Sequence, residues 1–168
     1  RVPILELFPD REGLNYPGTY TATYDIALAK GILWASTTYG FLFKSADSGQ
    51  TWQNVIPDDE LNFQNPNHHG QCVDAYGDTI WVGTFQGMNV STDGGATWKN
   101  FSYLEGEDTD AVAKPGNFCV SVEHQVVNGK THVWVGSEPY YGLGRTGIVH
   151  TDDNGETWDY AAENVIPW

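Results

Sequence analysis

A short string built around one aspartate, one glycine and one tryptophan occurs three times, and this repetition limits the possible folds more than any other feature. The strings read KSADSGQTW, VSTDGGATW and VHTDDNGETW, at 44–52, 90–98 and 149–158. Each carries a small hydroxyl residue, an Asp, a Gly, a Thr and a Trp at the same relative positions. Such internal repetition indicates an architecture assembled from similar supersecondary units.

The chemistry of each string predicts a tight hairpin. The Asp carboxylate accepts hydrogen bonds from turn amides, and the Gly adopts a backbone angle that residues with a Cβ avoid. The Thr holds the exit of the turn, and the Trp packs between neighbouring sheets. We assign this structural role to Asp47, Gly49, Thr51 and Trp52, to Asp93, Gly95, Thr97 and Trp98, and to Asp153, Gly155, Thr157 and Trp158.

The segments around each string alternate as β-strands do. A run rich in branched and aromatic residues precedes each string and is centred on Trp34, Trp81 or Trp134. These runs are 31–37, 79–84 and 132–137. Further short runs on both sides complete four antiparallel strands per unit, named A to D in chain order, and the string forms the C–D hairpin. Four short strands per unit are typical of a β-propeller blade.

The sequence does not divide into a whole number of four-stranded units, because an additional segment precedes the first unit. Residues 5–17 resemble 53–66, which contain strand D of the first unit and the connector after it. We therefore expect an all-β partial propeller of three four-stranded antiparallel blades plus a leading D-type strand. It would belong to a larger propeller of about six to eight blades, or one completed by oligomerisation. The expected divisions are 1–19 (leading strand and connector), 20–57 (blade 1), 58–104 (blade 2) and 105–168 (blade 3).

The three strings resemble the Asp-box, or BNR repeat, of sialidase-like and sortilin-like β-propellers. This superfamily includes bacterial sialidases, xyloglucan-cleaving glycosidases, the sortilin lumenal domain and a photosystem II assembly factor. The resemblance covers essentially the whole chain and implies the fold. It also implies that the Asp-boxes are structural hairpins that lie away from the catalytic face, so they do not identify one function.

The acidic composition limits the classes of molecule that the chain can bind. The chain has 22 Asp and Glu against 8 Lys and Arg, for a net charge of −14. Such a field repels polyanions, so we expect no nucleic-acid partner. No apolar run approaches the ~18 residues of a membrane span. The expected partners are the remaining blades or a sister subunit, together with a glycan or protein ligand.

The rim formed by the D–A connectors and B–C loops is where propellers usually bind ligands. The third unit is longest between its two Trp residues, and its extra B–C loop carries Tyr140, Tyr141 and Arg145 among glycines. Aromatic faces and a guanidinium suit sugar stacking and carboxylate binding. These three residues are therefore candidate ligand contacts, the alternative being a long loop that covers an adjacent blade.

His68 and His69 precede strand A of blade 2, near the mouth of the expected central channel, and are further candidate contacts. Adjacent residues in a strand point to opposite faces, so this pair is not expected to share a metal ion. The acidic run at 105–110 lacks a calcium-loop pattern. We therefore expect neither a metal site nor a cofactor.

The two cysteines, Cys72 and Cys119, align with each other on strand A of blades 2 and 3. A disulfide needs Cα atoms within about 7 Å. Inner strands of adjacent blades are expected to lie farther apart than this. The sequence therefore predicts two buried free thiols.

Catalysis of the sialidase type, as the resemblance implies it, needs three Arg around a substrate carboxylate, a Tyr nucleophile with a Glu partner, and an acid–base Asp. The only Arg residues are Arg1, Arg11 and Arg145, and they do not occupy equivalent sites across blades. A two-carboxylate glycosidase needs two acids ~5–9.5 Å apart. No pair stands out among the rim carboxylates, which are Asp58, Asp59, Glu60, Glu105, Asp108 and Glu138.

The leading hypothesis is a non-catalytic Asp-box propeller module of a secreted or cell-surface protein that binds protein or glycan through its loop rim. One alternative is part of a sialidase-like or xyloglucanase-like glycoside hydrolase whose catalytic residues lie partly outside this chain. Another is a structural subunit that packs through open blade ends. Paired rim carboxylates, one with a raised pKa, would favour the hydrolase.

Overall fold

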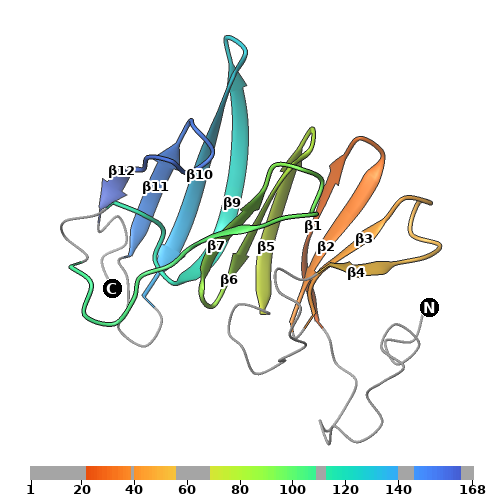
Figure 1. The fold of residues 1–168 in the computed structure, drawn as a ribbon, viewed down its shortest axis with the longest axis horizontal. Coiled ribbons are helices and arrows are strands. Elements are labelled where there is room, and N and C mark those ends of the chain that lie inside the picture. Colours follow the sequence, from red (N-terminus) through yellow and green to blue (C-terminus); the bar gives the residue numbers. More distant parts are fainter. Residues whose placement is uncertain (1–21, 39, 56–68, 109–112, 140–145, 164–168) are drawn as a thin grey trace, which may run out of the picture.

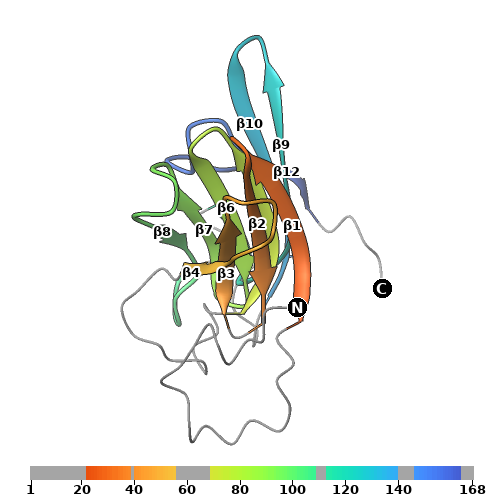
Figure 2. The ribbon, with the colours of Figure 1, turned by 90° about the vertical axis from the view of Figure 1, so that its right-hand side faces the viewer.

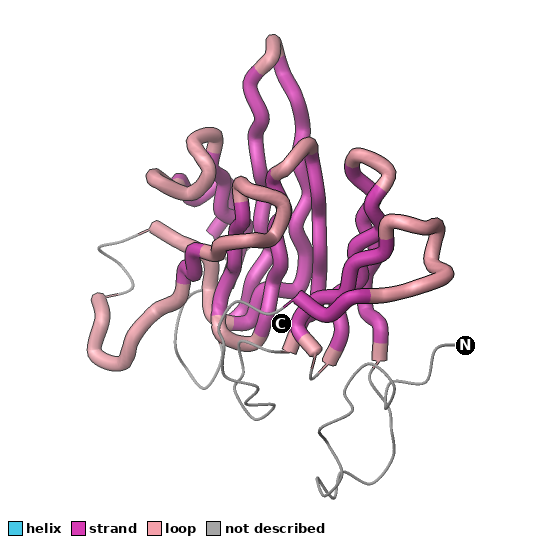
Figure 3. Tube along the Cα trace, turned by 45° about the vertical axis from the view of Figure 1, so that its right-hand side comes forward, coloured by secondary structure: helices cyan, strands magenta, loops and turns pink. Residues whose placement is uncertain are grey.

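The computed structural model describes residues 22–38, 40–55, 69–108, 113–139 and 146–163. Within these ranges the chain forms twelve β-strands and no helix (Figure 3). Accordingly, the described part offers no helix suited to crossing a membrane. The expected leading D-type strand lies outside the described residues.

The strands form three four-stranded antiparallel sheets, here called blades 1, 2 and 3. Blade 1 contains β1 (Thr23–Ala29), β2 (Ile32–Thr37), β3 (Phe41–Ser45) and β4 (Gln53–Val55). Blade 2 contains β5 (Gly70–Tyr76), β6 (Thr79–Thr84), β7 (Gly87–Ser91) and β8 (Lys99–Phe101). Blade 3 contains β9 (Phe118–Val127), β10 (Lys130–Glu138), β11 (Gly147–Thr151) and β12 (Asp159–Glu163). Neighbouring strands follow chain order in every sheet, which confirms the predicted A-to-D meander.

The three blades stand side by side (Figure 1). Their first strands contact one another in sequence, β1 with β5 and β5 with β9. The A–B and C–D hairpin turns gather at one end of the blades, and the B–C loops lie at the other (Figures 1 and 2). The end with the B–C loops is called the loop rim below, and the other end the hairpin rim. This is the arrangement of blades in a propeller, and the predicted fold class is confirmed.

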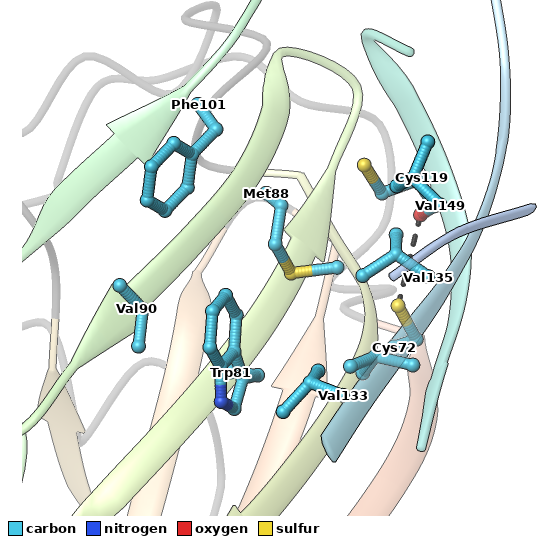
Figure 4. Close-up of a cluster of buried hydrophobic side chains, with 10 residues drawn as sticks. Cys72, Trp81, Met88, Val90, Phe101, Cys119, Val133, Val135 and Val149 are labelled. Carbon is cyan, nitrogen blue, oxygen red and sulfur yellow. Dashed lines mark hydrogen bonds between the residues drawn. The ribbon is translucent and has the colours of Figure 1, made fainter. Parts of the chain in front are cut away.

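Apolar side chains fill the spaces between consecutive blades. Between blades 1 and 2, Trp34 and Leu42 pack with Val73, among others. Between blades 2 and 3, Trp81 and Met88 point toward β9 and β10 (Figure 4). Burial of these side chains is the main favourable term that holds the sheets together.

The two Trp residues of a blade contact opposite neighbours. Trp34 and Trp81, in the second strands, pack against the following blade and are each 2% exposed. The Asp-box Trp packs backward: Trp98 meets Phe41 of blade 1 with ring centroids 5.1 Å apart. In the same way Trp158 meets Trp81 of blade 2 at 5.9 Å. Trp34, Trp81, Trp98 and Trp158 thus each lie between two neighbouring sheets.

Repeat positions that are buried between blades are exposed on the outer face of blade 1 and on the outer face of blade 3. Trp134 in β10 aligns with Trp34 and Trp81 but is 37% exposed. On the other side, Ile26 in β1 is 62% exposed, whereas the aligned Val73 in β5 is 3% exposed. The outer faces of blades 1 and 3 thus carry side chains of the kind that blade interfaces bury.

The register corrects the expected alignment of the two cysteines. Cys72 pairs with Gly83, whereas Cys119 pairs with Ser137, one position further along β10 than the equivalent of Gly83. Both ladders shift register at this point, so the offset comes from the hairpins: β10 begins four residues before its Trp, whereas β6 begins two residues before its Trp. Similarity of sequence alone therefore aligned the wrong residues. Both thiols are nevertheless free and buried, as expected.

Candidate functional site

The Asp-box of blade 2 shows how each hairpin is held. Asp93 Oδ2 accepts a hydrogen bond from Thr97 Oγ1 at 2.6 Å, and Asp93 Oδ1 accepts one from Thr97 N at 2.9 Å. Ser91 Oγ donates to Asp93 Oδ1 at 2.7 Å and accepts from Gly95 N at 2.8 Å. The carboxylate is therefore occupied by donors of its own turn, which is a structural role.

These bonds also stabilise the ionised carboxylate. The hydroxyl of Thr97, followed by its amide and by Ser91, lowers the pKa of Asp93 to about 2. The equivalent Thr residues have the same effect in the other two boxes, where the pKa values of Asp47 and Asp153 are also about 2. The three Asp-boxes are thus chemically equivalent hairpins, all at the hairpin rim.

The loop rim carries a row of aromatic rings that crosses from blade 2 to blade 3. His69, directly before β5, stacks on Phe85 of the β6–β7 loop with centroids 5.1 Å apart. Phe85 in turn meets Phe118, the first residue of β9, edge to face at 4.9 Å. All three rings are partly buried. This set, His69, Phe85 and Phe118, is called the aromatic row below.

Hydrogen bonds fix the loop that carries Phe85. Thr84 Oγ1 accepts from Gln86 N at 3.0 Å and donates to Gly87 O at 2.9 Å. Gly87 has a φ of 93° and an amide that donates to Asn117 O at 2.7 Å. The loop is therefore tied to the segment that enters β9.

The described parts of the connector between blades 2 and 3 are also tied down. Tyr103 N donates to Asn117 Oδ1 at 2.6 Å, and Asn117 Nδ2 donates to Tyr103 O at 2.9 Å. Lys114 Nζ lies over the Tyr103 ring at 4.6 Å and pairs with Glu107 Oε1 at 2.6 Å. The hydrogen bond from Lys114 lowers the pKa of Glu107. These contacts hold the described parts of the connector in place next to Phe118 of the aromatic row.

Of the ligand contacts expected from the sequence, the structure describes only His69. The others, His68, Tyr140, Tyr141 and Arg145, lie outside the described residues. The rim carboxylates Asp58, Asp59 and Glu60 lie outside them as well. Among the remaining acids, Glu105 and Asp108 are exposed and Glu138 is partly buried at the end of β10.

Two polar clusters escaped the sequence analysis. His124 Nδ1 contacts Asp74 Oδ2 at 2.6 Å across the interface of blades 2 and 3. This pair lines a small pocket at the hairpin rim with Tyr76, Thr79, Trp81, Thr131 and Asn154. On the outer face of blade 3, His132, His150 and Asp152 come together. Finding either cluster from sequence would have required the register between strands or between blades.

Comparison with known proteins agrees with this geometry. The family model described as BNR/Asp-box repeat matches residues 90–100. A search of curated proteins finds no significant match.

Several solved structures share the fold. YCF48 from Cyanidioschyzon merolae has a TM-score of 0.59 at 22% identity, and the match covers 83% of this chain and 39% of that one. A structure of YCF48 bound to D1 peptide has a TM-score of 0.56 at 19% identity, covering 83% and 40%. An ancestral GH74 enzyme has a TM-score of 0.60 at 16% identity, covering 86% and 18%.

The extracellular domain of a one-component system from B. thetaiotaomicron is a further match, with a TM-score of 0.59 at 14% identity, covering 86% of this chain and 17% of that one. This chain spans less than half the length of each of these neighbours. At such identities the likeness concerns the fold. Residues 90–100 carry a BNR/Asp-box repeat, and the three described sheets have the fold of part of a β-propeller.

Proposed function

We propose that the chain is part of a non-catalytic, extracellular Asp-box propeller whose loop rim binds a segment of another protein. The observation that carries this proposal is the aromatic row, in which three partly buried rings stand on a rim fixed by hydrogen bonds. Rings that are already held in place offer contact area at a low cost in conformational entropy. The row joins two blades, so an extended segment lying along the rim would contact both.

The charge of the chain suggests the character of that segment. A net charge of −14 attracts partners with a basic face and speeds their association. A protein of the same fold, YCF48, has been solved bound to D1 peptide, which supports a peptide as the type of ligand. The extracellular domain among the structural neighbours supports the proposed location.

A glycan is the second candidate, because sugars also stack on aromatic faces such as that of Phe85. Hydrolysis of a glycan is less well supported by the described carboxyl groups. A glycosidase needs a general acid with a raised pKa. Every described carboxyl group with a shifted pKa has it lowered, and these groups are Asp47, Asp93, Glu107, Asp152 and Asp153.

Phe85→Ala tests the proposal. The chain would be screened against arrays of basic, neutral and acidic peptides and against a glycan array. We expect binding to basic peptides, and we expect Phe85→Ala to weaken it by about tenfold or more, as for a central aromatic contact. Tyr76→Ala is the matched control, because it removes a 50% exposed ring from the hairpin rim. Circular dichroism would verify that both variants fold.

Each outcome distinguishes the candidates. Peptide binding that is lost in Phe85→Ala and kept in Tyr76→Ala supports the protein ligand. Glycan binding with the same pattern supports the second candidate instead. Binding that both variants retain, or no binding on either array, would contradict the proposed role of the aromatic row.

A further inference from the structure

Three side chains of metal-ligating types converge on the outer face of blade 3. His132 lies in β10, His150 in β11, and Asp152 directly follows β11. One ligand atom from each lies within 4.8 Å of the other two. His132 Nδ1 and His150 Nε2 are 2.9 Å apart, and their rings stack with centroids 5.2 Å apart. All three residues are partly buried.

The sheet fixes this arrangement. Alternation along β10 places His132 and Trp134 on one face, while Val133 points into the core between blades 2 and 3. Trp134 pairs directly with His150 in the antiparallel ladder, and their ring centroids are 4.4 Å apart. Asp152 follows His150 by two positions. A site on paired strands is held more precisely than a site on a loop.

The repeat itself does not require these residues. Each position can be located from the strand-B Trp of its blade. His132 lies two residues before Trp134, His150 lies opposite Trp134 on strand C, and Asp152 lies two residues after His150. The register gives the equivalents in blade 1 as Ile32, Lys44 and Ala46, and in blade 2 as Thr79, Val90 and Thr92. Blades 1 and 2 therefore form with no metal-ligating side chain at these positions. The three metal-ligating side chains of blade 3 are thus not needed to form a blade and call for another explanation.

We propose that His132, His150 and Asp152 bind one divalent cation of intermediate softness, such as Zn²⁺. Imidazole nitrogens and a carboxylate oxygen are the ligands that such ions take, with water in the fourth position. His132 Nδ1 and His150 Nε2 face each other at 2.9 Å, so one nitrogen of each ring can point at a single ion between them. Two ligands of a tetrahedral Zn²⁺ lie about 3.4 Å apart, so the rings need only separate slightly.

The third ligand is a charged carboxylate with a displaceable partner. Lys130 Nζ lies 2.6 Å from Asp152 Oδ2, and its side chain is 56% exposed. An exposed ion pair of this kind contributes little stability, so a divalent cation can displace it. Calcium is disfavoured, because it requires six or more oxygen ligands.

Titration calorimetry of the full chain with ZnCl₂ tests the site. We expect one Zn²⁺ per chain at this site. Losing a ligand should cost at least as much as losing an outer-shell partner, so His132→Ala and His150→Ala should each weaken binding by about 10- to 100-fold. Lys130→Met should tighten binding, because it frees the carboxylate of Asp152. His124→Ala is the matched control, because it removes a partly buried His from β9 that lies outside the cluster.

A second readout does not depend on the His variants folding. Bound Ni²⁺ or Cu²⁺ should quench the emission of Trp134, and the quenched fraction should disappear in Trp134→Phe. Absence of Zn²⁺ binding in the unaltered chain would overturn the proposal. So would an affinity that both His variants retain, an affinity that His124→Ala abolishes, or metal quenching that persists in Trp134→Phe.

Discussion

Trp81 of blade 2 and Trp158 of blade 3 meet edge to face, with ring centroids 5.9 Å apart and ring planes at 83°. One is the strand-B Trp of its blade, and the other is the Asp-box Trp of the next. Between blades 1 and 2, the Asp-box Trp98 likewise packs against the apolar cluster that contains the strand-B Trp34. Each repeat therefore has a forward and a backward contact, and the two Trp residues of a blade serve different interfaces.

Trp81 and Trp134 occupy the same repeat position but should differ in their contribution to stability. Trp81 is 2% exposed between two blades, so Trp81→Ala should lower the free energy of unfolding by about 3–5 kcal/mol. Trp134 is 37% exposed, so Trp134→Ala should cost about 1 kcal/mol. Urea denaturation of both variants measures the difference. Equal costs at the two positions would show that the forward contact of Trp81 is not what stabilises the chain.

Substitutions of two Asp-box glycines distinguish the cost of backbone strain from the cost of a steric clash. Gly155 has a φ of 82°, and an added Cβ would lie 2.3 Å from the Phe101 ring. Gly49 has a φ of 84°, but its nearest added contact would be at 3.7 Å. Gly49→Ala should cost about 1–2 kcal/mol from the left-handed backbone alone.

Gly155→Ala should cost about 1–3 kcal/mol more than Gly49→Ala, because it also overpacks the interface between blades 2 and 3. Thermal unfolding of the two variants compares them directly. A Gly155→Ala protein no less stable than Gly49→Ala would mean that the third Asp-box does not lie over Phe101.

Much of the fold follows from chemistry that acts within a few residues. The hairpins were predicted because Asp93, Gly95 and Thr97 satisfy one another locally, whatever surrounds them. The strand over 79–84 was predicted with the bounds that β6 has. The blade order also followed, since a chain of short antiparallel strands joined by tight turns has few other arrangements.

The Asp-box carboxylates make stability depend on pH in the acid range. The folded pKa of Asp93 is about 2 against an ordinary value of 3.8, so its contribution is complete above the ordinary value and is lost as pH falls through about 2. Asp93→Asn removes this contribution. The Tm of the variant should be below that of the unaltered chain near pH 6, and the two should converge toward about pH 2. A Tm difference that stays constant over this range would contradict the assignment.

The two thiols should be inert while the chain is folded. Burial raises the pKa of Cys72 to about 12, and it also raises that of Cys119, with the neighbouring Cys72 adding to the effect. The thiolate is the reactive form, so native labelling by a thiol reagent should be far slower than labelling in denaturant. Mass spectrometry of timed samples measures both rates. Rapid native labelling of either residue would place it outside the core between blades 2 and 3.

The candidate sites were harder to predict because they depend on pairing between distant residues. The contact of His132 with His150 depends on the β10–β11 register, and that of Asp74 with His124 depends on how two blades meet. The cysteine alignment failed because the β9–β10 hairpin extends two residues further beyond its Trp than the β5–β6 hairpin does, which changes the residue that lies opposite each cysteine. The aromatic row combines Phe85 from a loop with rings from the starts of two strands, which only the packed blades bring together.

The packing of one blade's Asp-box onto the previous blade is the central structural claim, and nuclear Overhauser spectroscopy tests it most directly. With Trp resonances assigned by single Trp→Phe variants, we predict cross-peaks between the indole protons of Trp158 and those of Trp81. Cross-peaks between Trp98 and Phe41 should accompany them. Their absence, in a folded sample that still shows the hairpin contacts within each Asp-box, would contradict the arrangement of the blades.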